Sequence, residues 1–449
     1  MRVVIVGAGK LGFSLAERLA QEEHEVIVIE QDEERRLIVQ NSLDVLAIVG
    51  NGANPQFLSN SVAKGADLLV AVTDSDEVNM IACMAAKKIG IPQTIARVRN
   101  QEYAGAAQFN FNESLGIDLA INPEMTTAIE ISRILLTPAA LAVEDFAEGK
   151  VRLLEVKISQ ASKLVNIPLL KLTLPPQILV AGILRQNIMI VPHGQDFLLP
   201  QDNVFFVGEA AAIETFGKQF ADKRSKTERV MIIGAGRIGR HLAKILVKVG
   251  LSVKVIDKNR DRCRELAEHL GKGLVLCGEG TDVDLLVEEG VGDADAVVCL
   301  TDDDKLNLLL ALLAKNLGAQ KTIVRVGRAD YMALMGKVGV DVVLSPRLLT
   351  AGVILRQVRR GNIVAVTLLE GAKAEAMEIL VPDDCQITGK KLKDLKFPRN
   401  SLVGALIHGE EVSVPDGETI LHGGDRVVVF TLPDMVKKVG KYFESRTQK

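Results

Sequence analysis

Two glycine-rich segments carry the residue types and spacing best suited to chemistry in this chain. The segment VVIVGAGKLG begins at Val3 and VMIIGAGRIG begins at Val230, and each places GxGxxG between a Val/Ile-rich run and a helical pattern. In this context the first glycine permits a tight turn, the second lets a pyrophosphate approach the backbone, and the third lets helix and strand pack closely. The alternative interpretation is that these glycines only form turns and that the acidic residue after each segment is a solvated surface residue. Because the arrangement occurs twice, we favour dinucleotide binding at the start of both helices.

An acidic residue follows each glycine segment at the end of the next predicted strand. Glu30 lies 18 residues beyond Gly12, and Asp257 lies 18 residues beyond Gly239. A carboxylate at this place accepts hydrogen bonds from a ribose hydroxyl, and its charge repels a 2′-phosphate. The sequence therefore favours NAD over NADP.

Further polar residues follow the later predicted strands, whose carboxyl ends border ligands in such sheets. The residues after the third strand border the adenine in this hypothesis, and the arginines at the fifth strand suit a pyrophosphate or an ATP tail. Lys10 and Arg237 either neutralise phosphate or are solvated cations, and Arg99 is either a ligand or one half of an ion pair. The predicted nucleotide contacts are Gly7, Ala8, Gly9, Lys10, Leu11, Gly12, Glu30, Asn51, Ala53, Thr73, Asp74 and Arg97 in the first copy, and Gly234, Ala235, Gly236, Arg237, Ile238, Gly239, Asp257, Glu279, Thr281, Thr301 and Arg325 in the second.

The whole chain repeats itself. Gly7 and Gly234 are 227 positions apart, and AVTDSDEVNMIACMAAKKIG matches CLTDDDKLNLLLALLAKNLG at a spacing of 228. The spacing then becomes 223, which joins VPHGQDFLLPQDNVFFV to VPDGETILHGGDRVVVF. The chain therefore consists of two copies of a unit of about 220 residues, each with a large first part and a small second part.

Short Val/Ile runs alternate with helical patterns in each large part, which predicts a doubly wound parallel sheet. In the first copy the expected strands are residues 3–6, 25–29, 45–49, 68–72 and 94–98, and the expected helices are residues 12–21, 32–41, 55–64 and 76–89. The fold class is α/β, with two Rossmann lobes, each followed by a crossover helix and a small α+β lobe.

Prolines at 123 and 346 open the crossover helices at residues 124–137 and 347–360. Strand-like runs punctuated by Pro, Gly and Asn follow at 151–208 and 374–431. The expected domains are 1–137, 138–222, 229–360 and 361–449, with a Lys/Arg-rich linker at 217–229. The apolar helix positions Ile129, Ile134, Leu135, Leu348, Ile354 and Leu355 should pack across subunits or between the two copies; packing within one lobe is the alternative.

Composition excludes several classes of protein. A net charge of −3 and a pI near 6.2 argue against a nucleic-acid partner. The five cysteines form no CxxC motif, so we predict no disulfide framework and no metal site. The apolar run LLLALLA ends at Lys315, short of a membrane span, and the first residues fit a strand, turn and helix better than a signal peptide. We expect a cytoplasmic protein that reaches a membrane through a partner.

Catalysis has little support in the sequence. None of the six histidines recurs at an equivalent place in both copies, and HExxH, GxSxG and Walker A motifs are absent. We therefore predict a protein that is not an enzyme. The main alternative is an NAD-dependent oxidoreductase, and a third is an architectural protein with a fixed structural nucleotide.

The segments VIVGAGKLG, AVTDSDEVNMIA, TIARVRN and FAEGKV, together with Glu30, resemble the TrkA family. These are peripheral NAD-binding regulatory proteins of the Trk potassium uptake system, built from RCK (KTN) units. The resemblance implies binding of NAD(H), with ATP or ADP as further ligands, and a homo-oligomeric ring, as a tetramer, beneath a membrane potassium transporter of the TrkH type. It also implies a location at the inner face of the plasma membrane and assigns the contacts above to nucleotide. The chain departs from many RCK units at Asn51 and Glu279, where an Asp is usual.

Overall fold

The computed structural model describes residues 1–60, 63–104, 114–137, 140–220, 227–328, 330–358, 363–369 and 373–445. The chain divides into two compact units. The first contains Met1–Thr126 with Leu349–Val358, and the second contains Thr127–Leu348 with Arg359–Lys449. Within the described ranges, no helix is both long and apolar enough to cross a membrane.

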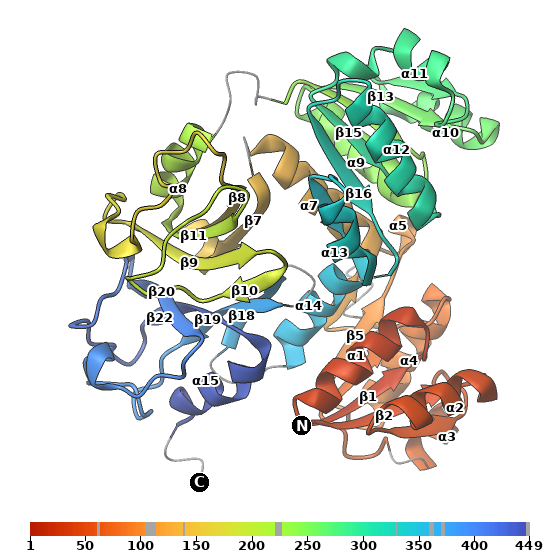
Figure 1. The fold of residues 1–449 in the computed structure, drawn as a ribbon. Coiled ribbons are helices and arrows are strands. Elements are labelled where there is room, and N and C mark those ends of the chain that lie inside the picture. The colour runs from red at the N-terminus through yellow and green to blue at the C-terminus, as the bar shows by residue number, and fades with distance from the viewer. Residues whose placement is uncertain are drawn as a thin grey trace. The chain divides into compact units, whose positions relative to one another are not determined.

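The first Rossmann lobe is a six-stranded parallel sheet in the order β3-β2-β1-β4-β5-β6 (Figure 1). The central strands consist of Val, Ile, Leu and Ala and are buried, as expected for strands covered by helices on both faces. The strands are β1 (Arg2–Val6), β2 (Glu25–Glu30), β3 (Leu46–Val49), β4 (Leu68–Ala71), β5 (Gln93–Arg97) and β6 (Leu119–Ile121), and the helices are α1 (Lys10–Gln21), α2 (Glu33–Ser42), α3 (Pro55–Asn60), α4 (Asp76–Lys88) and α5 (Gln101–Ala104).

These elements correspond to the predicted strands and helices of the first copy, with three differences. The short helix α5 was not predicted. The predicted third helix extends to residue 64, whereas α3 ends at Asn60, and residues 61–62 lie outside the described ranges. Strand β6 was not predicted, because it is only three residues long and two of them are half-buried.

The second Rossmann lobe repeats the same strand order, β14-β13-β12-β15-β16-β17. Side chains that alternate along β12 enter two different cores: Val230 and Ile232 lie on one face of the sheet, and Met231 and Ile233 lie on the other. Its strands are β12 (Arg229–Ile233), β13 (Ser252–Asp257), β14 (Leu274–Cys277), β15 (Ala296–Cys299), β16 (Lys321–Arg325) and β17 (Val342–Leu344), and its helices are α9 (Arg237–Lys248), α10 (Arg260–Leu270), α11 (Val283–Glu288), α12 (Asp304–Asn316) and α13 (Asp330–Lys337).

Each crossover helix belongs largely to the compact unit that contains the Rossmann lobe of the other copy. Helix α7 (Pro123–Leu136) buries Ile134 and Leu135 in the core of the second lobe's sheet, beside Val230. Residues 349–358 of α14 (Pro346–Val358) belong to the compact unit that contains the first lobe. The two crossover helices are therefore exchanged between the copies of one chain.

The predicted packing positions of the two crossover helices differ in burial. Ile354 and Leu355 are fully buried like Ile134 and Leu135, and Leu348 is half-buried. Ile129 is 45% exposed within this chain, so its packing across subunits stays a prediction. Residues 359–360 of the predicted second crossover helix, and residues 221–226 of the predicted linker, lie outside the described ranges.

Each small lobe is a five-stranded antiparallel sheet followed by a helix. The first has the order β10-β9-β11-β8-β7, and the second has the order β18-β19-β22-β20-β21. The elements are β7 (Ala140–Phe146), β8 (Val151–Lys157), β9 (Ile178–Arg185), β10 (Ile188–Ile190), β11 (Asn203–Glu209) and α8 (Ala210–Gly217), then β18 (Ile363–Leu369), β19 (Ala374–Leu380), β20 (Ser401–His408), β21 (Glu411–Ser413), β22 (Arg426–Thr431) and α15 (Val436–Tyr442).

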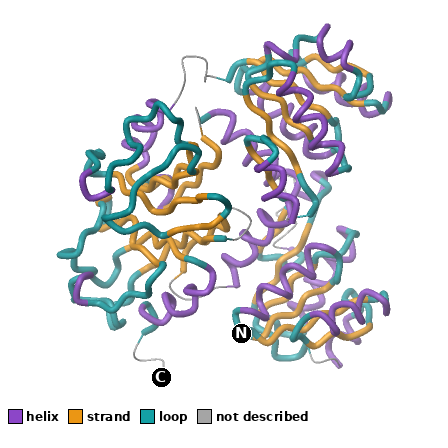
Figure 2. Tube along the Cα trace, in the orientation of Figure 1, coloured by secondary structure: helices purple, strands orange, loops and turns teal. Residues whose placement is uncertain are grey.

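The strands of the two small lobes lie against one another (Figure 2), and the lobes share one hydrophobic core. Phe205 and Phe430 meet with ring centroids 5.7 Å apart, and a Cβ at Gly182 would lie 2.4 Å from the Phe430 ring. Strands β7 and β18 lie within the predicted domains 138–222 and 361–449 but precede the predicted strand-like runs, which begin at residues 151 and 374, and they complete the sheets.

Candidate functional site at the carboxyl ends of the parallel strands

The fold brings the predicted contacts of each copy to one end of one sheet. The glycine loop follows β1, Glu30 ends β2, Asn51 follows β3, Thr73 follows β4 and Arg97 ends β5. The strand order reverses direction between β1 and β4, and this is the point at which doubly wound sheets open a crevice for ligands. The second copy has the same arrangement around β12 and β15.

The first and third glycines of each loop are required by the protein itself. Gly7 has φ +103° and Gly234 has φ +114°, a region that side-chain-bearing residues rarely adopt. A Cβ at Gly12 would lie 1.9 Å from the Gly7 carbonyl oxygen, and a Cβ at Gly239 would lie 2.0 Å from that of Gly234. Nothing larger than glycine therefore fits where helix and strand meet.

The middle glycine of each loop is different, because neither backbone nor packing requires it. Gly9 and Gly236 have φ of −63° and −65°, which any residue adopts. A Cβ built at either position meets no described atom within 4 Å. Glycine at both places leaves open space beside the backbone N–H groups, which is the geometry that a pyrophosphate approaching the backbone requires.

The helices that follow the glycine loops also start in an unusual way. Gly9 and Gly236 are their N-cap residues, and no side chain caps either helix. Other helices of the Rossmann lobes have their first N–H groups bonded by a side chain; such caps include Asp32, Ser75, Asn259, Asp282 and Asp303. The first N–H groups of α1 and α9 therefore have no side-chain cap, and the positive end of the helix dipole lies behind them, a geometry that suits an anion.

The predicted ribose acids hold the glycine loops in place. Glu30 Oε2 accepts the Ala8 N–H at 2.6 Å, and its other oxygen accepts the N–H of Gln31 at 2.8 Å. Asp257 does the same with Ala235 at 2.7 Å and Asn259 at 2.8 Å. A carboxylate has about four acceptor positions, so capacity for ribose hydroxyls remains. Each acid therefore holds its glycine loop by a hydrogen bond and also lies at the carboxyl end of the sheet.

A buried asparagine in each copy was not among the predicted site residues. Asn79 accepts the Thr73 N–H at 2.8 Å, and its amide donates to the Arg97 carbonyl at 2.9 Å. Asn307 makes the equivalent bonds to Thr301 at 2.9 Å and to Arg325 at 3.0 Å. Each asparagine joins the ends of two neighbouring strands. Its recurrence inside an otherwise apolar helix face was the sequence signal that could have identified it.

The arginines of the fifth strands lie partly buried beside the crevice. The Arg97 side chain is 17% exposed, and Nη1 lies 3.4 Å from the Thr73 carbonyl and 3.5 Å from the carboxylate of Asp74. Its buried Nε has no hydrogen-bond partner among the described atoms. Loss of water, reinforced by neighbouring Arg99, lowers the pKa of Arg97 from its ordinary value. A further anion would therefore stabilise its charge.

The second copy preserves this arrangement. Arg325 Nη1 donates to the Thr301 carbonyl at 3.2 Å and lies 3.9 Å from the carboxylate of Asp304. Arg99 has no arginine counterpart, since Gly327 stands at its place. The structure pairs Arg99 with Asp76 at 3.2 Å, which is the ion-pair alternative.

The remaining predicted residues complete the rim. Asn51 Oδ1 accepts the Ala53 N–H at 2.9 Å and so shapes the loop after β3. In the second copy Glu279 and Thr281 lie exposed on the corresponding loop. Lys10 and Arg237 are exposed at the helix starts, Leu11 is half-buried, and Ala8, Ala235 and Ile238 are buried.

Comparison with protein families identifies both halves of each copy. The TrkA-N domain model matches residues 3–123 and 230–346, and the TrkA-C domain model matches residues 153–221 and 376–444. These matches cover both Rossmann lobes and both small lobes and confirm the duplication.

Curated relatives share the length of this chain. A Methanosarcina mazei protein named Trk system potassium uptake protein TrkA homolog 1 is 41% identical over 452 residues, covering 99% of this chain and all of that protein. The Halomonas elongata protein named Trk system potassium uptake protein TrkA is 35% identical over 439 residues, with 96% of each covered. Both relatives are named as potassium uptake proteins of the Trk system.

Solved structures show the same fold at low identity. The GsuK RCK domain matches with a TM-score of 0.62 and 17% identity, covering 98% of this chain and 94% of that one. A structure described as the GsuK channel bound to NAD has the same TM-score and identity, with 98% and 78% covered. These likenesses confirm the predicted RCK architecture.

Proposed function

This chain belongs to the TrkA family, and we propose that it is a nucleotide-sensing subunit that gates a membrane potassium transporter of the TrkH type. NAD(H) binds at the carboxyl ends of both parallel sheets, and ATP or ADP competes for the same places. The protein is held at the inner face of the plasma membrane through the transporter.

The observation that carries the proposal is the open middle glycine of both loops. At Gly9 and Gly236 the described protein leaves empty the volume that a Cβ would fill, directly at an uncapped helix start. A pyrophosphate is an anion that approaches backbone N–H groups at such a place. A solved GsuK channel of this fold is described as bound to NAD and another as bound to ADP, which supports the ligand class.

The other groups of the edge suit the rest of a dinucleotide. The carboxylates of Glu30 and Asp257 accept ribose hydroxyls and disfavour a 2′-phosphate. The arginines Arg97 and Arg325 supply planar cations for phosphate oxygens. Since no acid–base pair recurs in both copies, the bound nucleotide acts as a signal.

Assembly into a ring combines the nucleotide-binding energies of several sites, and this energy drives gating. Exchange between the copies buries much of the apolar surface of the crossover helices, so a different surface must join subunits. Ile81 on α4 and Leu309 on α12 occupy equivalent places and are 43% and 56% exposed. Opening a channel from mostly shut to mostly open takes about 5.5 kcal/mol, which four sites provide when each prefers the active state tenfold. Two chains already hold four such sites, so this energy sets a minimum of two chains; we propose a tetramer, the ring that the family resemblance implies.

Calorimetric titration with NADH tests the nucleotide sites. We expect two equivalents per wild-type chain, one in Gly9→Ala, one in Gly236→Ala and none in the double variant, because each added methyl occupies the space of the pyrophosphate. The fold should persist in all three, since the methyl meets no described protein atom. Two equivalents in the double variant would overturn the assignment. ADP and ATP titrated against NADH-loaded protein should displace it.

Light scattering tests the assembly. Wild-type protein at micromolar concentration should have the mass of four chains, and Ile81→Glu with Leu309→Glu should shift it to smaller species. Glu34→Lys on the exposed face of α2 is the control for a charge change alone. A strictly monomeric wild type would rule out the ring.

A further inference from the structure

A buried aspartate in each small lobe provides an internal comparison. Asp202 precedes β11 and Asp425 precedes β22, 223 positions apart, and both side chains are 2% exposed. Both carboxylates are anchored by a backbone N–H at 2.7 Å, from Leu199 in the first lobe and from His422 in the second. The two lobes therefore hold equivalent carboxylates by equivalent backbone hydrogen bonds.

The first lobe neutralises its carboxylate with a permanent cation. Arg185, the last residue of β9, donates from Nε to Asp202 Oδ1 at 3.0 Å and from Nη2 to Oδ2 at 2.8 Å. The same guanidinium also bonds to the Phe197 carbonyl at 2.7 Å. Such a bidentate pair satisfies both the charge and the acceptors of a buried carboxylate.

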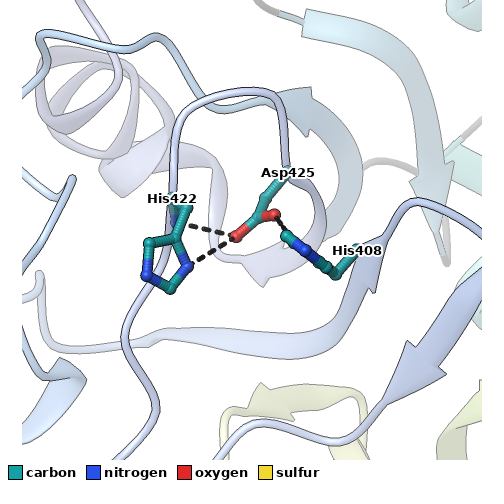
Figure 3. Close-up of side chains that lie close together, drawn as sticks. All are labelled: His408, His422 and Asp425. Carbon is teal, nitrogen blue, oxygen red and sulfur yellow. Dashed lines mark hydrogen bonds and ion pairs between the residues drawn. The ribbon is translucent and has the colours of Figure 1, made fainter.

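The second lobe has exchanged this cation for two imidazoles. His408 stands at the place of Arg185, and His422 stands at the place of Leu199. His408 Nδ1 lies 2.6 Å from Asp425 Oδ1, and His422 Nδ1 lies 3.9 Å from Oδ2 (Figure 3). A buried carboxylate needs a compensating cation, and the second lobe no longer supplies one that is always charged.

We propose that His408, His422 and Asp425 bind a zinc ion. One ligand atom from each residue lies within 4.8 Å of the others, and the two rings are 6.2 Å apart between centroids. Tetrahedral zinc has ligands about 2.0–2.1 Å away, so the ligand atoms need to draw closer. The histidine side chains are 72% and 64% exposed and are free of packing that would prevent this movement, while Asp425 stays fixed.

The surroundings define the type of site. Two imidazoles and a carboxylate are ligands that zinc accepts, and three protein ligands leave a fourth position for water. The bond from the His422 N–H to Asp425 Oδ2 orients the carboxylate from behind, as outer partners do in metal sites. Neither a cysteine motif nor a histidine that recurs in both copies marks this arrangement in the sequence. The signal lies in the histidines that do not recur.

Zinc binding is measured by competition with a chromophoric chelator, using the full chain with Cys277→Ser, because Cys277 is an exposed thiol and thiolates are zinc ligands. We expect one equivalent in this background. His408→Arg and His422→Leu restore the first lobe's residues, so both variants should fold and bind zinc at least tenfold more weakly. His193→Arg, in a loop of the first lobe, should leave binding unchanged.

The reverse exchange provides the second arm of the test. Arg185→His with Leu199→His should give the first lobe a zinc site and raise the stoichiometry to two equivalents. Zinc should also raise the melting temperature of the background protein and leave that of His408→Arg unchanged. No zinc equivalent in the background protein, or full binding by His408→Arg, would overturn the site and leave a His408–Asp425 hydrogen bond in its place.

Discussion

The two copies of the repeat agree at their parallel sheets and differ in their small lobes. Around β1 and β12 the glycine geometry, the acid bound to the loop and the buried asparagine recur with distances that differ by about 0.1 Å. Around Asp202 and Asp425 the backbone frame recurs, but the partner changes from an arginine to a pair of histidines. The sheet edges therefore keep one geometry twice, whereas the small lobes bond their buried carboxylates to different side chains.

A second difference lies in the exchanged helices. Glu130 of α7 is buried beside Arg133 at 3.3 Å, whereas the equivalent residue of α14 is Val353. Burial, with nearby Glu144, raises the pKa of Glu130 to about 8. The first copy thus carries an ionisable group at a helix position where the second copy has an apolar side chain.

The largest effect should come from the third glycine of the loop. Gly12→Ala forces a methyl against the Gly7 carbonyl, so we expect a loss of about 3 kcal/mol in the free energy of unfolding. Gly9→Ala should change it by less than about 1 kcal/mol, since only the N-cap preference is altered. Denaturant unfolding of the two variants measures the contrast. Equal stability would mean that the loop does not pack as described.

The buried asparagines should contribute equally in the two copies. Asn79→Ala leaves the Thr73 N–H and the Arg97 carbonyl without their partner, which should cost about 2–3 kcal/mol. Asn307→Ala should cost the same, and Asn41→Ala on the exposed side of α2 should cost little. Denaturant unfolding gives all three values, and a large inequality between the copies would break the equivalence of the two edges.

The small lobes should respond unequally. Arg185→Met deprives a buried carboxylate of its bidentate partner and should cost about 2 kcal/mol. With a chelator present, His408→Met removes one hydrogen bond and should cost about 1 kcal/mol. Unfolding measured with and without zinc separates the two cases. If both variants lost the same stability under both conditions, the lobes would not differ in chemistry.

The smallest effect should be a pH dependence confined to the first copy. The native pKa of Glu130, about 8, lies above its ordinary value of 4.5, so the native state binds more protons between these values and its stability falls as pH rises through this window. Glu130→Gln should therefore gain on the order of 1 kcal/mol at pH 8.5 relative to pH 5.5. Glu34→Gln should show no such trend. Thermal melts at the two pH values measure it, and a gain that is independent of pH would contradict the assignment.

Much of this architecture could be predicted because it is local in the sequence. Alternation of apolar runs and helical patterns located the first lobe's strands β1 to β5, and the spacing of Gly7, Gly9 and Gly12 placed the loop. The strand β7 escaped prediction because Glu144 and Asp145 interrupt its apolar pattern. Its hydrogen bonds to β8 decide its conformation.

What could not be predicted depends on contacts between distant segments. The apolar face of α7 indicates that the helix is buried. The chain contains two nearly equivalent parallel sheets, and the sequence does not indicate on which of them α7 packs. The bond between Glu30 and the Ala8 N–H spans 22 positions, so the acid was expected as a ribose ligand alone. Likewise, the convergence of His408 and His422 on Asp425 follows from the pairing of β20 with β22.

The most direct test of the proposed function is potassium uptake by proteoliposomes that contain the partner transporter and this protein. With wild-type protein, exchange of NAD for NADH or of ADP for ATP should change the uptake rate. The Gly9→Ala, Gly236→Ala double variant should still bind the transporter and give one rate that is independent of nucleotide. An unchanged response in the double variant, or no response in the wild type, would contradict the account.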